Sequence, residues 1–260
     1  MRNWGMPDEV EGKLVLTSPN RREVIEAIAA LPAIGGFTVA HRSEHSLSDA
    51  YFDTPERDLA GAKLALRIRG EDGRDRLTLK GDASIESGVV SRSELELEWS
   101  PGALENVLQA VREGGVTLNT SRIDSTHGAA AALESLDLHA KAARTNHRTA
   151  LELAGALGTV VAELDVDRVV FTGGRRQVRH YEVECEAHGG HGGEAIGAVL
   201  ADLSSRFEGL RAVTYSKLAL AEHLEHLEAE GRLAAMLDGD GLRPEAYGEI
   251  EMALQGDDVT

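Results

Sequence analysis

The chain has 260 residues, of which 42% are hydrophobic, so it can bury a substantial core in one large domain or two small ones. Its 44 acidic and 27 basic residues give a net charge of −17, which argues against nucleic acid and anionic membrane surfaces as partners. Any anionic ligand must therefore be held by clustered bases or by a metal. The start of the chain lacks a secretory signal, and no apolar run approaches the ~20 residues that span a bilayer, so we expect a cytoplasmic protein. Cys185 is the only cysteine, which excludes an intrachain disulfide, and we interpret it as a small buried hydrophobe.

Strands and helices alternate in a repeated order along the first half of the chain. Period-two alternation predicts strands at residues 9–16, 38–52, 63–69 and 74–80, and again at 89–99. Apolar residues at helical spacing predict a helix from Asn20 to Leu31, with Asn20 as its N-cap and Pro32 closing it, and a second helix over residues 103–112. The first five elements therefore read β-α-β-β-β.

The second half repeats this order. Residues 114–138 are expected to form a loop that leads into a short alanine-rich helix. Three more strands are predicted at residues 141–153, 159–171 and 177–187, the last two joined by a Gly173-Gly174 turn. Helices are expected at residues 194–210 and 216–237, and the acidic stretch 238–260 is expected to be partly disordered. We expect a main domain over residues 1–218 and a C-terminal helix with an acidic tail over residues 219–260.

The charged residues are sorted by sign on the predicted strands. Side chains two apart leave a strand by the same face, so each of several strands presents a row of like charges. The rows and single charges are Glu9, Glu11 and Lys13; Arg67 and Arg69; Lys80; Arg92, Glu94, Glu96 and Glu98; Arg144 and Arg148; Glu163, Asp165 and Asp167; and Glu182, Glu184 and Glu186.

Two arrangements explain such rows. The simpler is an antiparallel sheet with one face in water. However, like charges along or across a sheet destabilise it, and several helices with single apolar stripes also need a surface to pack on. Helices on the outer apolar faces and charges turned inward around a wet tunnel satisfy both needs. Carboxylates without His or Cys partners suit Mg²⁺ or Mn²⁺, and arginine forks match phosphate oxygens, so together they select a metal-bound polyphosphate.

The same segments, taken in order, resemble the CYTH family, also called triphosphate tunnel metalloenzymes. They are EVEGK, which matches the family's E-x-E-x-K pattern, followed by YFDTP, LALRIR, TLK, RSELE, RTNHR, ELDVD, YEVECE and YSK. The resemblance covers about residues 7–218. It implies an α+β fold with an eight-stranded antiparallel β-barrel, or tunnel, made from two β-α-β-β-β halves with helices packed outside. It also implies hydrolysis of inorganic triphosphate, thiamine triphosphate or nucleoside triphosphates, although some members cyclise ATP.

The resemblance also assigns roles to individual residues. Lys13 would lie close to the reacting phosphate or its attacking water, as the catalytic residue. The residues implied as metal ligands are Glu9, Glu11, Asp165, Glu182 and Glu184. Those implied to hold phosphate oxygens are Arg67, Arg69, Lys80, Arg92, Arg144, Arg148 and Lys217. Because ELDVD carries three acids on one face, Glu163 or Asp167 could replace Asp165, and RTNHR does not decide which arginine reaches the substrate.

The function expected from the sequence is hydrolysis of a triphosphate with Mg²⁺ or Mn²⁺ as cofactor, and inorganic tripolyphosphate is the favoured substrate. The alternatives are a class IV-type adenylate cyclase and a noncatalytic binder of polyphosphate or organic phosphates. We expect a small-molecule triphosphate as partner and neither nucleic acid nor membrane, while monomer and homodimer both stay open. No GxxxxGK[ST], GxGxxG or GxSxG motif is present, and the pairs His188/His191 and His223/His226 are each too few for a metal site.

Overall fold

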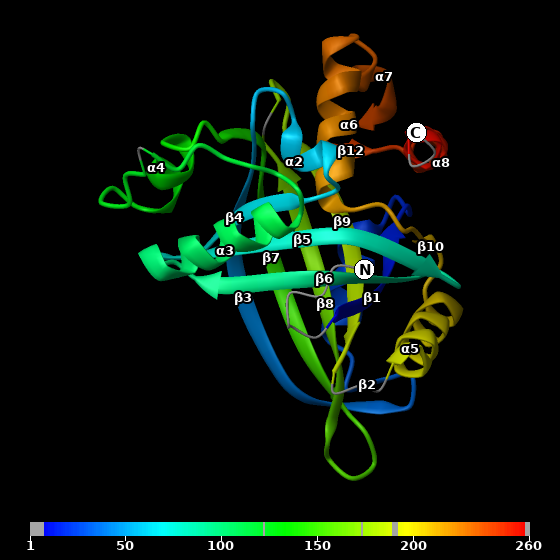
Figure 1. Cartoon of the computed structure of the whole chain (residues 1–260). Coiled ribbons are helices and arrows are strands. Elements are labelled where there is room, and N and C mark those ends of the chain that lie inside the picture. Colours follow the sequence, from blue (N-terminus) through cyan, green and yellow to red (C-terminus); the bar gives the residue numbers. More distant parts are fainter. Residues whose placement is uncertain (1–7, 122, 173, 189–191, 258–260) are drawn as a thin grey trace. The chain divides into compact units, whose positions relative to one another are not determined.

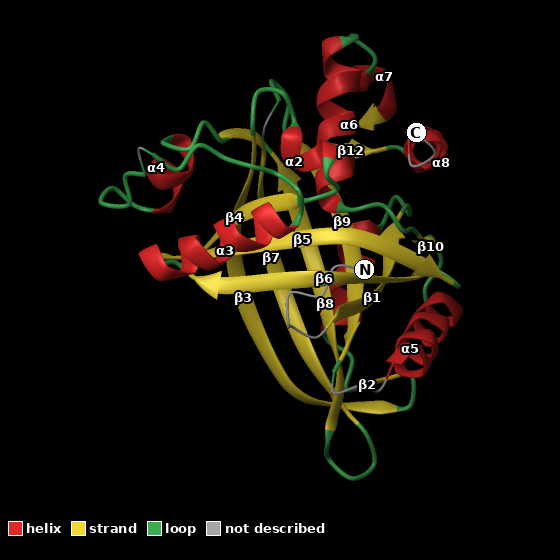
Figure 2. Cartoon of the chain, viewed as in Figure 1, coloured by secondary structure: helices red, strands yellow, loops and turns green. Residues whose placement is uncertain are grey.

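The computed structural model describes residues 8–121, 123–172, 174–188 and 192–257 (Figure 1). Eight strands pair in the closed order β1-β6-β5-β4-β3-β7-β8-β9, since β9 pairs again with β1. This is the predicted eight-stranded antiparallel barrel with helices outside it, so the predicted fold class is confirmed (Figure 2). The barrel strands are β1 (Asp8–Leu16), β3 (Phe37–Asp53), β4 (Ala65–Glu71), β5 (Arg74–Glu86), β6 (Val89–Glu98), β7 (His139–Ala154), β8 (Val160–Phe171) and β9 (Val178–Ala187).

The chain forms two compact units that interleave in sequence. The first comprises residues 1–9, 47–84 and 91–144, and the second residues 10–46, 85–90 and 145–260. The elements outside the barrel order are α1 (Arg21–Ala29), β2 (Ala33–Ile34), α2 (Asp58–Gly61), α3 (Pro101–Glu113), α4 (Ala129–Glu134), α5 (Gly192–Arg206), β10 (Leu210–Ala212), α6 (Lys217–Ala229), α7 (Leu233–Met236), β11 (Leu237–Asp238), β12 (Gly241–Leu242) and α8 (Pro244–Asp257).

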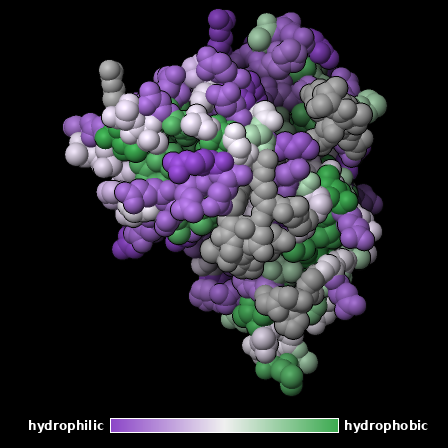
Figure 3. Space-filling view, viewed as in Figure 1, coloured by the Kyte–Doolittle hydropathy of each residue, from purple (hydrophilic) through white to green (hydrophobic). Residues whose placement is uncertain are grey.

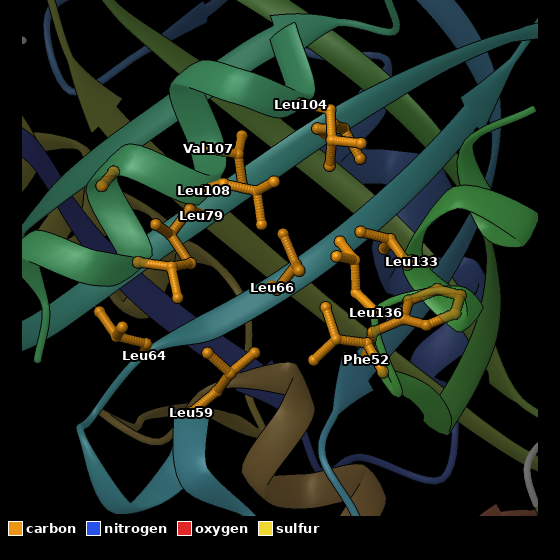
Figure 4. Packing of buried hydrophobic residues seen from close by; sticks show 14 of the residues in the cluster. Phe52, Leu59, Leu64, Leu66, Leu79, Leu104, Val107, Leu108, Leu133 and Leu136 are labelled. Atoms are coloured by element: carbon orange, nitrogen blue, oxygen red, sulfur yellow. The ribbon is translucent and has the colours of Figure 1, made fainter. Parts of the chain in front are cut away.

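In the first unit, α3 and α4 cover the apolar faces of β4 and β5 (Figure 4). The helix α3 begins at Ser100, whose hydroxyl accepts a hydrogen bond from the Ala103 N–H at 3.0 Å, and Pro101 follows at the first helical position. Its apolar stripe packs on residues that alternate with charged ones along the strands. The labelled members of this core are Phe52, Leu59, Leu64, Leu66, Leu79, Leu104, Val107, Leu108, Leu133 and Leu136.

In the second unit, α1 and α5 pack on the apolar face that includes Leu164, Val183 and the free Cys185. Cys185 is completely buried, as predicted, because it lies on the other face of its strand from Glu184 and Glu186. Gly12, between the two residues Glu11 and Lys13, lies directly beneath α5. A Cβ at Gly12 would lie 2.5 Å from Ile196, so only glycine lets the helix approach this closely.

The helices after β9 differ from the prediction. The helix α5 ends at Arg206 rather than at residue 210, because Gly209 has a φ of +83° and turns the chain into β10. The predicted helix 216–237 is two helices, since Gly231, at a φ of +73°, ends the first of them. The turn predicted at Gly173-Gly174 lies partly outside the described residues, because Gly173 is not among them.

The expectation of partial disorder over residues 238–260 is wrong for its described part, which runs to Asp257. This segment forms β11, β12 and α8, and it buries Leu242, Tyr247 and Ile250 completely. A few apolar residues suffice to hold this segment in place, because these three are completely buried. Residues 258–260 lie outside the described residues.

The surface in Figure 3 is largely hydrophilic over α6 and α7, while the hairpin between β7 and β8 ends in hydrophobic residues. Leu157 at this hairpin is 97% exposed. None of the helices in the described part of the chain combines the length and apolar character needed to cross a membrane.

Candidate functional site

Strand register brings the acidic rows of the second unit together. In the β8–β9 pair, Asp165 lies opposite Glu184 and Asp167 lies opposite Glu182. On the other side of β9, Lys13 of β1 lies opposite Glu184. Leucine, valine and cysteine occupy the alternate positions and face the core, so the side chains of these four acids leave by the other face. We call Asp165, Asp167, Glu182 and Glu184 the acidic cluster.

Three basic side chains reach into the acidic cluster. The Lys217 ammonium lies 3.1 Å from Asp167 and 2.5 Å from Glu184, and it also contacts Glu182. Lys13 Nζ lies 2.8 Å from Glu184. The Arg148 guanidinium donates to both oxygens of Asp167 at 2.8 and 2.7 Å, and it also contacts Asp165. Four carboxylates therefore face three bases.

The acids of this cluster differ in charge state. Burial opposes ionisation of Glu182, but Lys217 and Lys13 outweigh it and hold the pKa of Glu182 at about 2. Burial likewise opposes ionisation of Glu184, and Lys13, Lys217 and Arg148 hold its pKa well below the ordinary value. At Asp165, burial and the neighbouring acids prevail over Arg148, so its pKa lies well above the ordinary value. Three bases thus neutralise three of the four carboxylates, and the fourth, Asp165, favours its protonated form when no further cation is present.

The donor set fits a hard divalent cation. Asp167, Glu182 and Glu184 each offer an oxygen, and these oxygens lie within 4.8 Å of one another. Asp165 adds a buried oxygen, Oδ1, that has no hydrogen-bond partner among the described residues. Clustered carboxylates without nitrogen or sulfur ligands are typical of Mg²⁺ and Mn²⁺ sites. The structure therefore includes Asp167, the alternative to Asp165, in the closest group of acids.

The first unit holds the opposite arrangement around Asp49. Arg69 donates to its two oxygens at 2.9 and 3.1 Å, Arg144 donates to Oδ2 at 2.9 and 2.6 Å, and the Arg67 guanidinium lies 3.7 Å away. We call Arg67, Arg69 and Arg144 the arginine cluster. Burial opposes ionisation of Asp49, but the three guanidinium groups hold its pKa well below the ordinary value. Tyr51 stacks on Arg144, whose Cζ lies 5.4 Å from the ring centroid.

The arginine cluster has donors to spare. Arg67 Nε and Arg144 Nη1 are buried and have no hydrogen-bond partner among the described residues. Arg67 also donates to Thr78 at 3.1 Å, and both Arg67 and Thr78 contact Glu96. Because buried N–H groups normally find an acceptor, these two atoms favour an anionic ligand.

A second group in the first unit surrounds Glu9. Lys80 Nζ lies 2.9 Å from both Glu9 oxygens, and Arg92 Nε donates to Glu9 at 2.7 Å. Lys80 also contacts Glu94 at 3.1 Å. Burial opposes ionisation of Glu9, but Lys80 and Arg92 hold its pKa well below the ordinary value. Glu9 and Lys80, predicted from separate motifs, are therefore direct neighbours.

The predicted site residues thus fall into three groups, each within one unit. The structure brings Lys13, Arg148, Asp165, Glu182, Glu184 and Lys217 together, joins Arg67, Arg69 and Arg144 through Asp49, and joins Glu9, Lys80 and Arg92. Glu11 is buried on β1 opposite Glu186 and is not in the group of close acidic oxygens. Of the four histidines discussed, His191 lies outside the described residues, and the exposed His226 contacts Glu230.

Sequence reasoning missed two features. Asp49 stands alone among small and apolar residues on β3, and only its register opposite Arg69 identifies its role. His180 contacts Glu182 and Tyr247 contacts His180, in a buried chain that no motif marked. The even spacing of Asp49, Tyr51 and Asp53, which puts all three on one strand face, was the available signal in the sequence for Asp49.

Comparison with known proteins agrees with this geometry. The model of the CYTH domain matches residues 8–212. An inorganic triphosphatase of Haemophilus influenzae is 35% identical over 92 residues, a match that covers 35% of this chain and 24% of that protein. The chain therefore spans about a quarter of the length of this relative.

Two solved structures have the same fold. A Hippeastrum protein, HpAC1, described as a candidate adenylyl cyclase with dominant triphosphatase activity, superposes with a TM-score of 0.55 at 23% identity, over 83% of this chain and 95% of that one. A candidate adenylate cyclase of Bacillus halodurans gives a TM-score of 0.51 at 17% identity, over 82% and 97% of the two chains. Since the family model extends over most of the chain and the barrel is the family's fold, the chain belongs to the CYTH family.

Proposed function

We propose that this protein hydrolyses a triphosphate, with inorganic tripolyphosphate as the favoured substrate, and that it depends on Mg²⁺ or Mn²⁺. The observation that carries the proposal is a pair of buried clusters with opposite surplus charge, each with an unpaired atom of its surplus sign. A surplus of carboxylates suits a divalent cation, and a surplus of guanidinium groups suits phosphate oxygens. Membership of the CYTH family and the triphosphatase relative support the same function.

The acidic cluster would hold the metal, through Asp165, Glu182 and Glu184 with Asp167 beside them, and we propose Glu9 and Glu11 as further ligands. A bound divalent cation would supply charge neutralisation on phosphate oxygens and activation of water. The arginine cluster would bind the phosphate oxygens whose charge grows during transfer, using the free Arg67 Nε and Arg144 Nη1. We propose that Lys80, Arg92, Arg148 and Lys217 bind the remaining oxygens.

The charge state of Lys13 limits the part it can take in the reaction. Burial disfavours its charged form, but Glu184, Glu182 and Glu11 outweigh burial and raise the pKa of Lys13 above its ordinary value. The side chain is therefore an ammonium group at neutral pH, with no lone pair to accept a proton. We propose that it donates a hydrogen bond to the reacting phosphate and stabilises negative charge there.

A substrate panel tests this function. Tripolyphosphate, thiamine triphosphate and ATP would each be incubated with the protein and Mg²⁺ or Mn²⁺, while phosphate release and cyclic AMP are followed. We expect phosphate release, fastest with tripolyphosphate, and its loss in excess chelator. Cyclic AMP without phosphate release would identify a cyclase, and tight binding without turnover would identify a noncatalytic binder.

Substitution of one ligand makes the test specific. Glu184→Gln keeps the side-chain size and removes one charge from the acidic cluster, so we expect turnover to fall by about 10²-fold or more. Glu230→Gln is the control, because Glu230 is exposed and its ion pairs, with His226 and Arg232, include no member of the acidic cluster. Equal losses in the two variants would contradict the assignment of the acidic cluster.

A further inference from the structure

A buried chain of hydrogen bonds connects the C-terminal helix to the acidic cluster. Glu182 and His180 lie on β9, and Tyr247 lies on α8. His180 Nε2 lies 2.9 Å from Glu182 Oε2, and His180 Nδ1 lies 3.1 Å from Tyr247 Oη. All three side chains are at most 1% exposed, so water does not compete for these bonds.

The chemistry of the three groups determines the direction of the hydrogen bonds. A carboxylate only accepts hydrogen bonds, so His180 donates from Nε2 to Glu182. In the tautomer that carries its hydrogen on Nε2, Nδ1 is the acceptor, and the Tyr247 hydroxyl donates to it. Loss of the Tyr247 hydroxyl would free the ring to exchange its hydrogen between the two nitrogens and to rotate.

The segment that carries Tyr247 is held to β9 and α1 by strand pairing and hydrogen bonds. Strand β12 pairs with β9 through Gly241 and Arg179, and the Arg179 N–H donates to the Asp240 carbonyl at 2.6 Å. Arg21 of α1 donates to the Leu242 carbonyl at 2.5 Å. This segment lies beyond residues 8–212, the part that the family model matches. Tyr247, which reaches Glu182 through His180, therefore lies outside the part of the chain that the family model matches.

We infer that Tyr247 and His180 are positioning residues that hold the Glu182 carboxylate for cation binding, so that the C-terminal segment completes the acidic cluster. One Glu182 oxygen is fixed by His180, which leaves the other, Oε1, directed at Lys217. This inference rests on the proposed function, because it takes the acidic cluster as the metal site. It extends that function by making metal affinity depend on residues that contact no metal.

The test measures Mn²⁺ binding to the whole chain directly, by calorimetric titration without substrate. Tyr247→Phe keeps the ring and its packing and removes only the hydroxyl. We expect Mn²⁺ affinity to fall by about 10-fold or more, the range typical when a group that orients a metal ligand is removed. The melting temperature of the metal-free protein should change little by comparison.

Tyr215→Phe is the matched control, because the Tyr215 hydroxyl is also buried but has no hydrogen-bond partner among the described residues. Its removal should leave Mn²⁺ affinity within about twofold. At His180, glutamine can place an N–H near the Nε2 position whereas leucine cannot, so His180→Gln should retain more affinity than His180→Leu. These two variants also decide the question if Tyr247→Phe fails to fold.

The outcomes separate this inference from the proposed function. If the wild type binds Mn²⁺ and hydrolyses tripolyphosphate while Tyr247→Phe and His180→Leu bind Mn²⁺ equally well, the positioning role is wrong and the proposed function stands. If the wild type binds no Mn²⁺, both are overturned. Equal weakening by Tyr247→Phe and Tyr215→Phe would also overturn the positioning role, because it would reflect general disturbance of the fold.

Discussion

The arginine cluster and the acidic cluster are built on the same plan with the charges exchanged. In the first unit a single carboxylate, Asp49, gathers three guanidinium groups. In the second unit a single ammonium, that of Lys217, gathers three carboxylates. Both Asp49 and Lys217 are almost fully buried among groups of the opposite charge. Asp49 therefore holds the guanidinium groups together, and Lys217 holds the carboxylates together, before any ligand binds.

The comparison teaches how a binding site is kept folded when its ligand is absent. Like charges in a buried cluster repel strongly, so a cluster that only a ligand could neutralise would destabilise the free protein. Counterions inside each cluster cancel part of the repulsion and leave more groups of one sign than of the other. The counterion is Asp49 in the arginine cluster, and Lys217, Lys13 and Arg148 serve in the acidic cluster. The surplus is visible as unpaired atoms, Arg67 Nε and Arg144 Nη1 in one cluster and Asp165 Oδ1 in the other.

The largest effect is expected from Asp49→Asn, because no other carboxylate bonds to two members of the arginine cluster at the distances described. The change leaves three buried guanidinium groups without their shared counterion, and it should lower the free energy of unfolding by about 3–5 kcal/mol. Urea denaturation at neutral pH measures this loss. Tripolyphosphate without metal should stabilise the variant more than the wild type, since it replaces the missing negative charge.

The matched control is Asp82→Asn in the same unit. Asp82 pairs with Lys63 at 3.5 Å, and both side chains are more than half exposed. Such exposed pairs contribute about 0–1 kcal/mol, so the control should unfold almost as the wild type does. A loss below about 1 kcal/mol for Asp49→Asn would mean that the arginine cluster needs no counterion and that the comparison fails.

The equivalent change in the acidic cluster is Lys217→Met. Lys13 and Arg148 remain to neutralise the carboxylates, so we expect a somewhat smaller loss, about 3 kcal/mol in the presence of chelator. The important result is that Mn²⁺ should reverse this loss of stability. Mn²⁺ should stabilise Lys217→Met more than the wild type, because the ammonium no longer competes for the same oxygens. Melting curves with and without Mn²⁺ measure this, with the exposed Lys63→Met as control.

Arg67→Ala separates ligand binding from stability. Asp49 keeps Arg69 and Arg144 when Arg67 is lost, so the melting temperature of the free protein should stay equal or rise. By contrast, loss of a donor to the transferred phosphoryl group should lower kcat/KM for tripolyphosphate by about 10²-fold, or ~2.7 kcal/mol. Arg67→Lys should rescue only part, because an ammonium lacks the planar fork.

Arg76→Ala is the control for Arg67, since Arg76 lies on the adjacent strand β5, is half exposed and pairs with Glu96. It should leave kcat/KM unchanged. If Arg67→Ala also leaves it unchanged, the arginine cluster binds no substrate.

The sequence was sufficient to predict the barrel because charged and apolar residues alternate along several strands and because the motifs follow the order found in the CYTH family. It was not sufficient for the partners within each cluster, which depend on register. Asp49 meets Arg69 across 20 residues and Arg144 across 95, and nothing local in the chain indicates either contact. In the same way, the β8–β9 register places Asp165 opposite Glu184 and Asp167 opposite Glu182, but only the side-chain positions show that Asp167 joins the close group of acidic oxygens.

The C-terminal segment was mispredicted for a different reason. Its composition is acidic and poor in apolar residues, which is typical of disorder, yet the described part buries Tyr247 and Ile250 fully. Composition counts residues without regard to where they lie. The anchors on β9 and α1 come from Arg179 and Arg21, which are distant in sequence, so no window of the chain contained the signal.

The smallest effect is expected from Asp165→Asn, and the informative result is the direction in which it changes the free energy of unfolding. Burial, Asp167, Glu163 and Glu184 raise the pKa of Asp165 despite Arg148, so its ionised form is less favourable in the folded protein than in the unfolded one. Its contribution to stability is therefore full below about pH 4 and is lost as pH rises through the raised pKa. Without metal, Asp165→Asn should be about 1 kcal/mol more stable than the wild type at neutral pH, and the gap should close toward pH 4.

Asp49→Asn should behave in the opposite way. The folded pKa of Asp49 is lowered, so its contribution is present above the ordinary pKa of 3.8 and is lost as pH falls through the folded pKa. Urea denaturation of both variants in chelator, from pH 4 to pH 7, compares the two slopes. With Mn²⁺ the order at Asp165 should invert, because a metal that binds Asp165 Oδ1 would stabilise the wild type alone. If Asp165→Asn stays more stable with Mn²⁺, Asp165 is not a ligand, and the acidic cluster binds its cation through Asp167, Glu182 and Glu184.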